Sequence, residues 1–408
     1  MIQGHRKLIG AALVAAAGVA AWTCTTAKKP FWYGRDATVE AAQVDDSYFP
    51  FFSKWLSRSG SDPLTYIVEK AKAHELVIVG EHHYMKDYCE LFARAVPEVY
   101  RKAGVRVIAL EVCNAEDNDK IARLVEGPAY DVPLAYEIAR SEDWELWGYK
   151  EYWDILEAAW ALNKSLPAGQ EHLRVVGIDK KMDFQLDALW RANKLTDAAL
   201  IEKAKSQPDI YKRDDWIVEN LEKEILGKGA KGLVLIGLNH SFTRYAQPKL
   251  DKDLKLEREW PRTGYILRQK YGDKVFQVAL HGPQMSPKVI DKTYQGAEPV
   301  MSDLVERIMA AHGNAPVGFD GTGSPFANIR DNLSYYYHWQ PRVTFADLNE
   351  GFVFVKPIKE LAPCSWMKGF ISDEMFEKSK VYYEFAYGRK FRNSREVDEF
   401  LASGLKTL

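Results

Sequence analysis

Glutamate and histidine side chains come directly after an apolar run in the segment ELVIVGEHHYMKDY, residues 75–88. Gly80 ends the run, and Glu81, His82 and His83 follow it. A carboxylate beside an imidazole can orient the ring and raise its basicity, so that the ring removes a proton from an attacking water. Imidazoles and carboxylates can also hold a divalent metal, which lowers the pKa of a bound water. Both kinds of chemistry need further partners from other parts of the chain.

Four more β-branched runs end in polar residues of the same kinds. They cover residues 105–112, 173–179, 232–239 and 274–280, and their ends carry Glu111, Asp179, Asn239 with His240, and His281. Runs that are apolar on both faces are typical of parallel strands covered by helices on both sides. The carboxyl ends of such strands meet at one edge of the sheet, where ligands bind. We therefore expect a shared site at this edge.

Histidine is concentrated at these strand ends, because four of the nine histidines lie within three residues of one. We expect His83 and His240 to belong to the site, whereas His281 is more simply an incidental polar residue. Adjacent residues of an extended chain point apart. His82 is therefore expected to point away from the site or to lie behind it.

Helical patterns separate the apolar runs, notably at residues 87–104 and 213–229, which begin at or near Asp and end at Gly. This alternation predicts an α/β fold with a mainly parallel central sheet flanked by helices. A helix-rich insertion at about 113–172 is expected near the C-terminal edge of the sheet. Its Trp153, Leu156 and Trp160 have helical spacing, which indicates a stripe facing the core; the alternative is a lid whose aromatic residues line a ligand pocket.

The N-terminus has the layout of an export segment. Basic residues precede about fifteen apolar residues at 8–22, which is too short for a typical membrane span. We expect residues 1–23 to be an export signal or a membrane anchor, and the protein to reach the bacterial periplasm or cell envelope. Cys24 is a candidate for lipid attachment, although Trp22 and Thr23 are poor residues for such a motif. A cleaved soluble form and an uncleaved anchor are the alternatives.

The rest of the chain divides by pattern into three parts. Residues 24–62 are expected to form a linker and an N-terminal arm, residues 63–360 an α/β domain, and residues 361–408 a C-terminal helical extension. The 408 residues are 47% hydrophobic and 27% charged, which favours a large folded protein.

Charge and cysteine content exclude several classes of function. Lys and Arg total 55 against 57 acidic residues without a long basic tract, so nucleic acid is not an expected partner and a small molecule or peptide is. Membrane contact is expected only through the N-terminal anchor or lipid. Cys89, Cys113 and Cys364 are widely spaced and predict neither a disulfide framework nor a thiolate metal site. A GxSxG nucleophile elbow is absent.

The order of the strand-end motifs resembles a known superfamily. VGEHH, IALEV, VGID, RDDWIVENL and VLIGLNHSF follow one another between about 75 and 245, with weaker similarity at 348–357. This order is similar to that of the superfamily that joins ChaN-type haem-binding lipoproteins, erythromycin esterases and Tiki/TraB-type metalloproteases. The spacing of Glu81 and His83 has the ChaN form. Ile217 stands where a Met is usual, and Leu238 where a small or polar residue is.

The resemblance implies three functions and their residues. The first is an exported hydrolase of an ester, lactone or peptide bond, using Glu81, His83, Glu111, Arg213 and His240. A divalent metal, if used, would be held by Glu81, His83, Asp179 and His240. Arg213 would hold a substrate carboxylate or an oxyanion, or would instead form a structural ion pair with Glu111 or Asp179. The second function is haem or iron uptake of the ChaN type, with Tyr336 and Tyr337 as candidate ligands. The third is a non-catalytic member of the fold.

Overall fold

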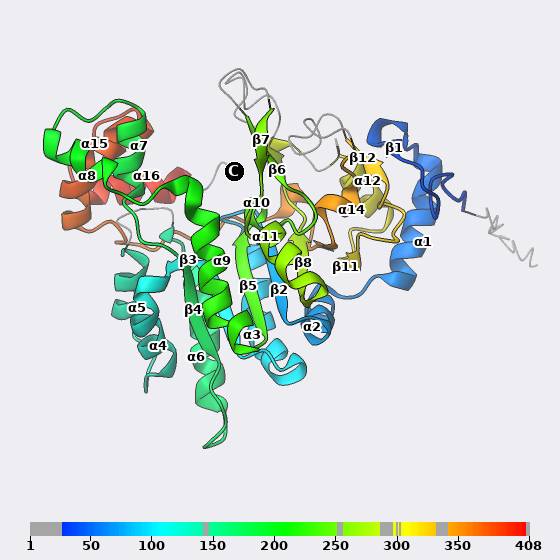
Figure 1. Ribbon diagram of the computed structural model, residues 1–408, viewed down its shortest axis with the longest axis horizontal. Helices are drawn as coiled ribbons and strands as arrows, with labels where there is room; N and C mark the ends of the chain where they lie inside the picture. Colours follow the sequence, from blue (N-terminus) through cyan, green and yellow to red (C-terminus); the bar gives the residue numbers. More distant parts are fainter. Residues whose placement is uncertain are drawn as a thin grey trace, which may run out of the picture.

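The computed structural model describes residues 27–141, 147–250, 256–285, 297–298, 301, 303–331 and 342–404. A seven-stranded sheet forms the centre of the molecule (Figure 1). Its order is β11 (Val317–Asp320), β13 (Gly351–Phe354), β8 (Val275–Leu280), β2 (Leu76–Glu81), β5 (Gly232–Gly237), β3 (Val107–Asn114) and β4 (Arg174–Asp179). Neighbouring strands are parallel except for β11 and β13. The predicted α/β fold is confirmed; the antiparallel edge strand β11 was not predicted.

Successive residues of a strand point to opposite faces of the sheet, and each face packs against a different set of helices. On β2, Val77 and Val79 belong to a core with α2 (Pro63–Ala73), α3 (Lys86–Ala103) and α6 (Lys150–Ser165). Leu76 and Ile78 belong to another core with α9 (Arg213–Glu224) and α11 (Thr263–Tyr271). Burial on both faces explains why each strand reads as a continuous apolar run.

The two helices predicted at residues 87–104 and 213–229 are present, but their ends differ from the prediction. Helix α3 spans 86–103, and Gly104 ends it with a φ of 74° in the left-handed region, where glycine has no steric penalty. The predicted start at Asp87 is one residue late: Met85 is the N-cap residue, and Asp87 lies in the first turn, where it accepts the Ala362 N–H at 2.7 Å. Helix α9 ends at Glu224, before Gly227.

The insertion between β3 and β4 covers one face of the sheet. It consists of a 3₁₀ turn (Ala115–Asp117), α4 (Asn118–Glu126), α5 (Val132–Ala139) and α6. In α6, Trp153 and Leu156 are buried in the core with α3, as the core-stripe interpretation predicts, whereas Trp160 is partly exposed. Only the start of this helix reaches the carboxyl edge of the sheet.

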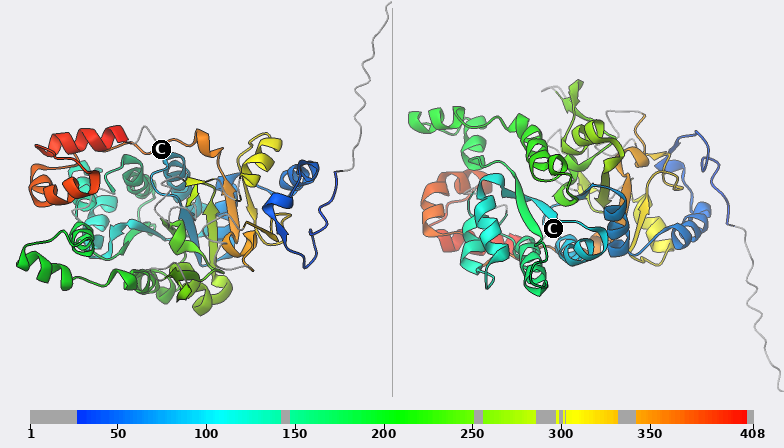
Figure 2. Two further views of the ribbon diagram at one scale, coloured as in Figure 1. Left: turned by 90° about the horizontal axis from the view of Figure 1, so that it is seen from above. Right: turned by 60° about the horizontal axis from the view of Figure 1, so that its bottom comes forward.

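Further elements gather at the two ends of the sheet (Figure 2). Beside β11 and β13 lie α1 (Phe49–Ser59), α12 (Leu304–Ala311) and α14 (Phe345–Leu348), which share a third core with Trp32. Beyond β4 lie α7 (Phe184–Arg191), α8 (Ala198–Lys205), α15 (Asp373–Tyr387) and α16 (Ser394–Gly404). The short elements are β1 (Val39–Glu40), β6 (Gln247–Leu250), β7 (Leu256–Trp260), β9 (Gln284–Met285), β10 (Ala297–Glu298), β12 (Ile329–Arg330) and α10 (Leu238–Ser241). Among the described residues, no helix is both long and apolar enough to cross a membrane.

A bulge in β3 sets the position of the polar strand ends. The parallel pairing of β3 with β4 shifts register between Leu110 and Asn114, and Glu111 lies within this interval. Gly177 of β4 makes the bulge possible, because a Cβ there would lie 2.3 Å from the carbonyl oxygen of Asn114. The close approach of the two backbones therefore requires glycine.

We expect Gly177→Ala to lower the free energy of unfolding by about 1–3 kcal/mol, because the added methyl group forces β3 and β4 apart. Urea denaturation of the variant and the wild type measures this change. A difference below about 0.5 kcal/mol would contradict the requirement for glycine.

Candidate active site

The order of the strands brings the predicted residues together. β2, β5, β3 and β4 are consecutive neighbours in the sheet, and Glu81, the last residue of β2, is in register with Gly237, the last of β5. Glu111 comes from β3, Asp179 ends β4, and Arg213 begins α9. A cavity of about 210 Å³ opens at this edge, lined by Glu81, His82, His83, Glu111, Arg213, Gly237, Leu238, Asn239, His240 and Pro283. All five residues predicted to be catalytic thus line one cavity.

Glu81 and His83 form a hydrogen-bonded pair. His83 Nδ1 lies 2.9 Å from Glu81 Oε1, and the same oxygen accepts the hydroxyl of Tyr152 at 2.7 Å. The Tyr152 hydroxyl in turn accepts the backbone N–H of Tyr84 at 3.0 Å. Tyr84 has a φ of 70°, so the chain turns sharply after His83. The first turn of α6 therefore fixes both the carboxylate and the turn that carries the imidazole.

The other nitrogen of His83 faces the cavity. Its Nε2 lies 4.0 Å from Glu111 Oε2, and the side chain is 31% exposed. Trp147 packs against the ring in a T-shaped arrangement, with centroids 5.2 Å apart. A Cβ on Gly237 would lie 2.7 Å from His83 Nε2, so glycine at the end of β5 leaves room for the imidazole. Since Nδ1 is bonded to Glu81, Nε2 is the nitrogen that can accept a proton from a water.

Arg213 bridges three of the other polar groups. Its Nε donates to Asp179 Oδ2 at 2.9 Å, its Nη2 to Glu111 Oε1 at 2.7 Å, and its Nη1 to His240 Nε2 at 3.0 Å. Nη2 also donates to Asp179 Oδ2 at 2.5 Å. The structural ion pairs considered for Arg213 are both present. These bonds use all but one of the guanidinium N–H donors, so a single N–H of Nη1 is left for a ligand.

His240 is held by Asp214, which lies in the RDDWIVENL motif, and by residues that the sequence did not indicate. Its Nδ1 lies 2.6 Å from Asp214 Oδ1, which also accepts the N–H and the hydroxyl of Thr263 at 2.9 Å and 2.8 Å. Arg262 Nε lies 2.7 Å from Asp214 Oδ2, and Arg262 Nη2 lies 3.2 Å from His240 Nε2. Because an arginine only donates, His240 Nε2 acts as an acceptor here and Nδ1–H donates to Asp214. The RDDWIVENL motif, which contains Arg213 and Asp214, was the only sequence signal for this part of the site.

Burial and charge shift the pKa values of the acidic groups in opposite directions. Burial raises the pKa of Glu111, but Arg213, His240 and His83 outweigh it and lower the pKa to about 2. Burial also raises the pKa of Asp214, and the His240 ring and Arg262 hold it well below its usual range. Burial raises the pKa of Glu81 despite its bonds to His83 and Tyr152. Glu111 is therefore the fixed anion of the cavity.

His83 becomes a stronger base in this environment. Burial alone lowers the pKa of an imidazole, but the hydrogen bond to Glu81 and the charges of Glu111 and Glu81 raise the pKa of His83 above the ordinary 6.5. Arg213 opposes this shift only in part. A raised pKa increases the affinity of Nε2 for a proton, which favours general-base catalysis near neutral pH.

The four candidate metal ligands do not offer free lone pairs around one point. Asp179 and His240 Nε2 both accept hydrogen bonds from Arg213, whose cationic guanidinium lies between them. In the part of the chain that the structure describes, no group of three or more His, Cys, Asp and Glu side chains is placed to hold a metal ion. This arrangement does not fit a divalent metal, and the metal expectation stays a prediction.

The other residues considered from the sequence are not part of the Glu81–His83 pair, and some lie outside the described residues. His281 is buried and its Nε2 lies 2.5 Å from Glu306 Oε1, away from the cavity wall. His82 contributes to the wall of the cavity, and burial lowers its pKa to about 3, so it is neutral; the expectation that it points away from the site or lies behind it stays a prediction. Cys24, Tyr336 and Tyr337 lie outside the described residues, and their assignment to lipid or haem stays a prediction.

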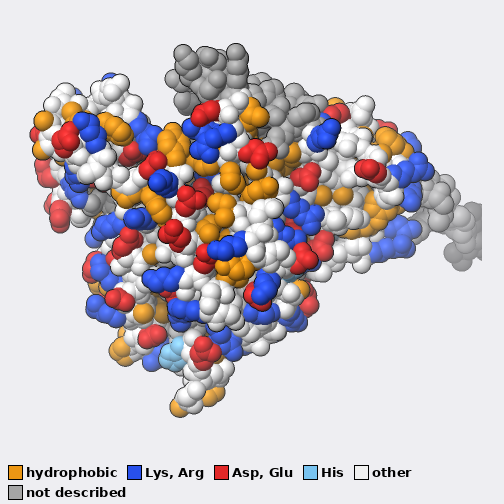
Figure 3. Space-filling view, viewed as in Figure 1, with side chains coloured by type: hydrophobic (Ala, Val, Ile, Leu, Met, Phe, Trp, Pro, Cys, Tyr) orange, Lys and Arg blue, Asp and Glu red, His pale blue; other side chains and the backbone are white. Residues whose placement is uncertain are grey.

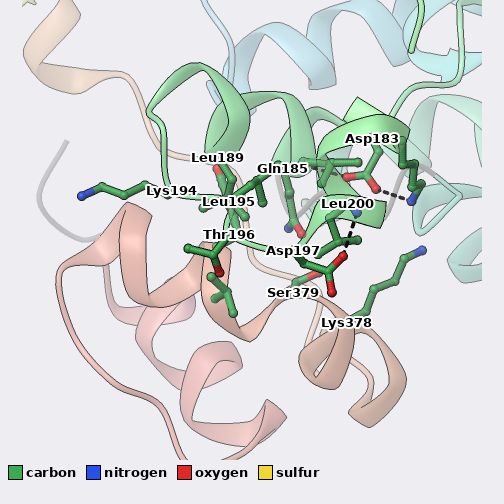
Figure 4. Close-up of a pocket in the computed structure, with 14 residues that line it drawn as sticks. Asp183, Gln185, Leu189, Lys194, Leu195, Thr196, Asp197, Leu200, Lys378 and Ser379 are labelled. Atoms are coloured by element: carbon green, nitrogen blue, oxygen red, sulfur yellow. Dashed lines mark hydrogen bonds and ion pairs between the residues drawn. The ribbon is translucent and has the colours of Figure 1, made fainter. Parts of the chain in front are cut away.

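A second cavity, of about 290 Å³, lies between α7, α8 and α15 (Figure 4). Leucines of α7 and α8 form much of its wall, and none of the predicted site residues lines it. Its Asp183 and Asp197 cap helices α7 and α8 by accepting backbone N–H groups, and Lys203 is paired with Asp183 at 2.9 Å. Because its acidic groups serve as helix caps, the candidate active site is the cavity at the strand ends.

No protein-family model and no curated protein sequence matches the chain. Solved structures are similar to it. For a succinoglycan biosynthesis protein the TM-score is 0.53 at 10% identity, over 80% of this chain and 100% of that one. For the erythromycin esterase EreC, in a mutant form in its open conformation, the TM-score is 0.44 at 11% identity, over 70% of this chain and 91% of the esterase. For ChaN of Campylobacter jejuni, which binds haem cofacially, the TM-score is 0.33 at 12% identity, over 52% of this chain and 84% of ChaN.

At these identities the comparisons establish the fold alone. The chain shares its α/β fold with the succinoglycan biosynthesis protein. An erythromycin esterase and a ChaN protein, the families that the strand-end motifs resemble, are among the structures similar to it.

Proposed function

We propose that the protein is a hydrolase of an ester, lactone or peptide bond in which His83 is the general base. The observation that carries this proposal is the Glu81–His83 hydrogen bond of 2.9 Å, with the second ring nitrogen on the cavity. A carboxylate–imidazole pair with one free nitrogen is the arrangement that activates water without a covalent intermediate. No serine elbow is present to act as an alternative nucleophile.

The reaction follows from the positions of these groups. His83 Nε2 takes a proton from a water as its oxygen bonds to the substrate carbonyl carbon, and Glu81 stabilises the imidazolium through Nδ1–H. The remaining Nη1–H of Arg213 is the donor in the cavity for the oxyanion that forms. His83 then returns its proton to the leaving oxygen or nitrogen as the carbon–heteroatom bond breaks. Glu111 keeps Arg213 charged and in place through its 2.7 Å bond.

A metal is not needed for this sequence of steps, because the imidazole itself raises the reactivity of water. The motif resemblance to erythromycin esterases makes an ester or lactone the first class of substrate to test. A peptide bond is the second.

We expect His83→Ala to lower kcat/KM for a hydrolysed ester about 10²- to 10⁴-fold, because the general base is lost. The assay is a panel of aryl esters, lactones and peptides, read by product release with and without EDTA. The matched control is His172→Ala, an exposed histidine just before the amino end of β4, at the opposite end of that strand from the cavity, which keeps the wild-type rate. Absence of turnover by the wild type over the whole panel would contradict the proposal. Loss of activity in EDTA, with metal found by elemental analysis, would replace it by a metal-assisted mechanism.

The pH dependence tests the Glu81–His83 pair separately. Neutral His83 is the active form, so kcat/KM falls as the pH falls through the pKa of His83. This acid limb of the pH profile lies above pH 6.5, because Glu81 raises that pKa. In Glu81→Gln the charge is lost, and we expect the limb to move to lower pH while the plateau falls about 10²-fold. A limb at the same pH in both enzymes would show that Glu81 does not tune His83.

We also propose that the protein works in the cell envelope on a small molecule or peptide, anchored through its N-terminus or a lipid on Cys24. The apolar segment at 8–22 supports this proposal. On the face seen in Figure 3, acidic and basic side chains are interleaved, as expected for a protein that does not bind nucleic acid.

We expect the full-length protein, expressed in a bacterium, to be recovered in the envelope fraction. The mass of its N-terminal peptide distinguishes an acylated Cys24 from a cleaved, soluble form and from an uncleaved anchor. Recovery of the intact chain only from the cytoplasm would contradict export.

A further inference from the structure

Two buried cysteines from distant parts of the chain are in contact. Cys89 lies on α3, and Cys364 lies in the segment before α15. Their Sγ atoms are 4.0 Å apart, although 275 residues separate them. Both are free thiols, 0% and 2% exposed, in the core that includes α3 and α6. The wide spacing in the sequence concealed this pair.

Backbone hydrogen bonds fix the two chain segments against each other. The Lys86 N–H donates to Ala362 O at 2.8 Å, and the Cys364 N–H donates to Tyr84 O at 2.8 Å. The Ala362 N–H also donates to the Asp87 carboxylate at 2.7 Å. The two segments are therefore fixed side by side, with the two sulfur atoms already in contact.

The same segments support the candidate active site. Tyr84, whose carbonyl accepts the Cys364 N–H, also donates its own N–H to the Tyr152 hydroxyl that binds Glu81. A covalent link at Cys89 and Cys364 would fasten the 362–364 segment to the turn that follows His83. The proposed hydrolase would then have its general base held by a cross-link.

We propose that Cys89 and Cys364 form a disulfide bond in the mature protein. One thiolate attacks the disulfide of an oxidant, such as a thiol–disulfide oxidoreductase or oxidised glutathione, and releases one of its thiols. The second cysteine thiolate then displaces the other thiol from the mixed disulfide. The two cysteines lose two protons and two electrons, and the oxidant disulfide is reduced to two thiols.

The bond forms while this part of the protein is open. Burial raises the pKa of the Cys89 thiol well above its usual value, so little thiolate exists in the closed structure. Contact with Cys89 lowers the pKa of Cys364, but burial and the nearby Glu151 act against this, and the net effect raises the pKa above its usual value. Once formed, the bond closes a loop of 275 residues, which restricts the unfolded chain more than a short loop does.

The experiment uses the full chain, equilibrated during refolding with reduced and oxidised glutathione and then digested without reduction. We expect one linked peptide pair that contains Cys89 and Cys364, lighter by two hydrogen atoms than the separate peptides. Cys113 is alkylated after denaturation and serves as the internal control. We also expect the oxidised protein to have a Tm about 5 °C higher than the reduced protein.

Variants separate the cross-link from other effects of oxidation. Cys113→Ala keeps the linked peptide and the Tm difference, whereas Cys89→Ala and Cys364→Ala lose both. If either of these does not fold, the peptide map of the wild type decides alone. Alkylation of both Cys89 and Cys364 under these oxidising conditions, or pairing of either with Cys113 or Cys24, would overturn the proposal. Failure of the ester panel leaves this test unaffected, because it does not measure catalysis.

Discussion

The guanidinium of Arg213 is the interaction on which the arrangement of the site depends. Glu111 and Asp179 lie at the ends of neighbouring strands with their carboxylates buried, and two anions in such a place repel each other. Arg213 lies between them and reaches His240 as well. Removing one partner of a buried ion pair typically costs about 3–5 kcal/mol, because the charge that remains is uncompensated. The edge of the sheet can therefore hold so many polar groups only because α9 begins with this residue.

The alternation of burial along the strands places the catalytic pair. Val77, Val79 and Glu81 have the same parity, so Glu81 faces the layer of α3 and α6, where Tyr152 meets it. Arg213 comes from α9, on the opposite layer. The cavity thus forms where the two helical layers approach across the edge of the sheet, and each layer supplies one half of the polar network.

Sequence patterns predicted the strands and the convergence of their ends, because both follow from local rules. Apolar runs give buried strands, and parallel strands bring their carboxyl ends together. The patterns could not predict Tyr152, Arg262 or the contact of Cys89 with Cys364, because these depend on packing between segments far apart in the chain. The sharp turn at Tyr84 was also not predictable, because no residue type there indicated a positive φ.

The positive φ of Tyr84 has a thermodynamic consequence. A non-glycine residue in this region costs about 1–2 kcal/mol, which the surrounding contacts must supply. Those contacts come from Tyr152 and from the segment that carries Cys364. When these neighbours loosen, the turn can relax to an extended form without disrupting the strands below it. The free energy that keeps His83 in position is therefore smaller than the free energy that keeps the sheet folded, and a sample can retain its secondary structure after its imidazole has left the cavity.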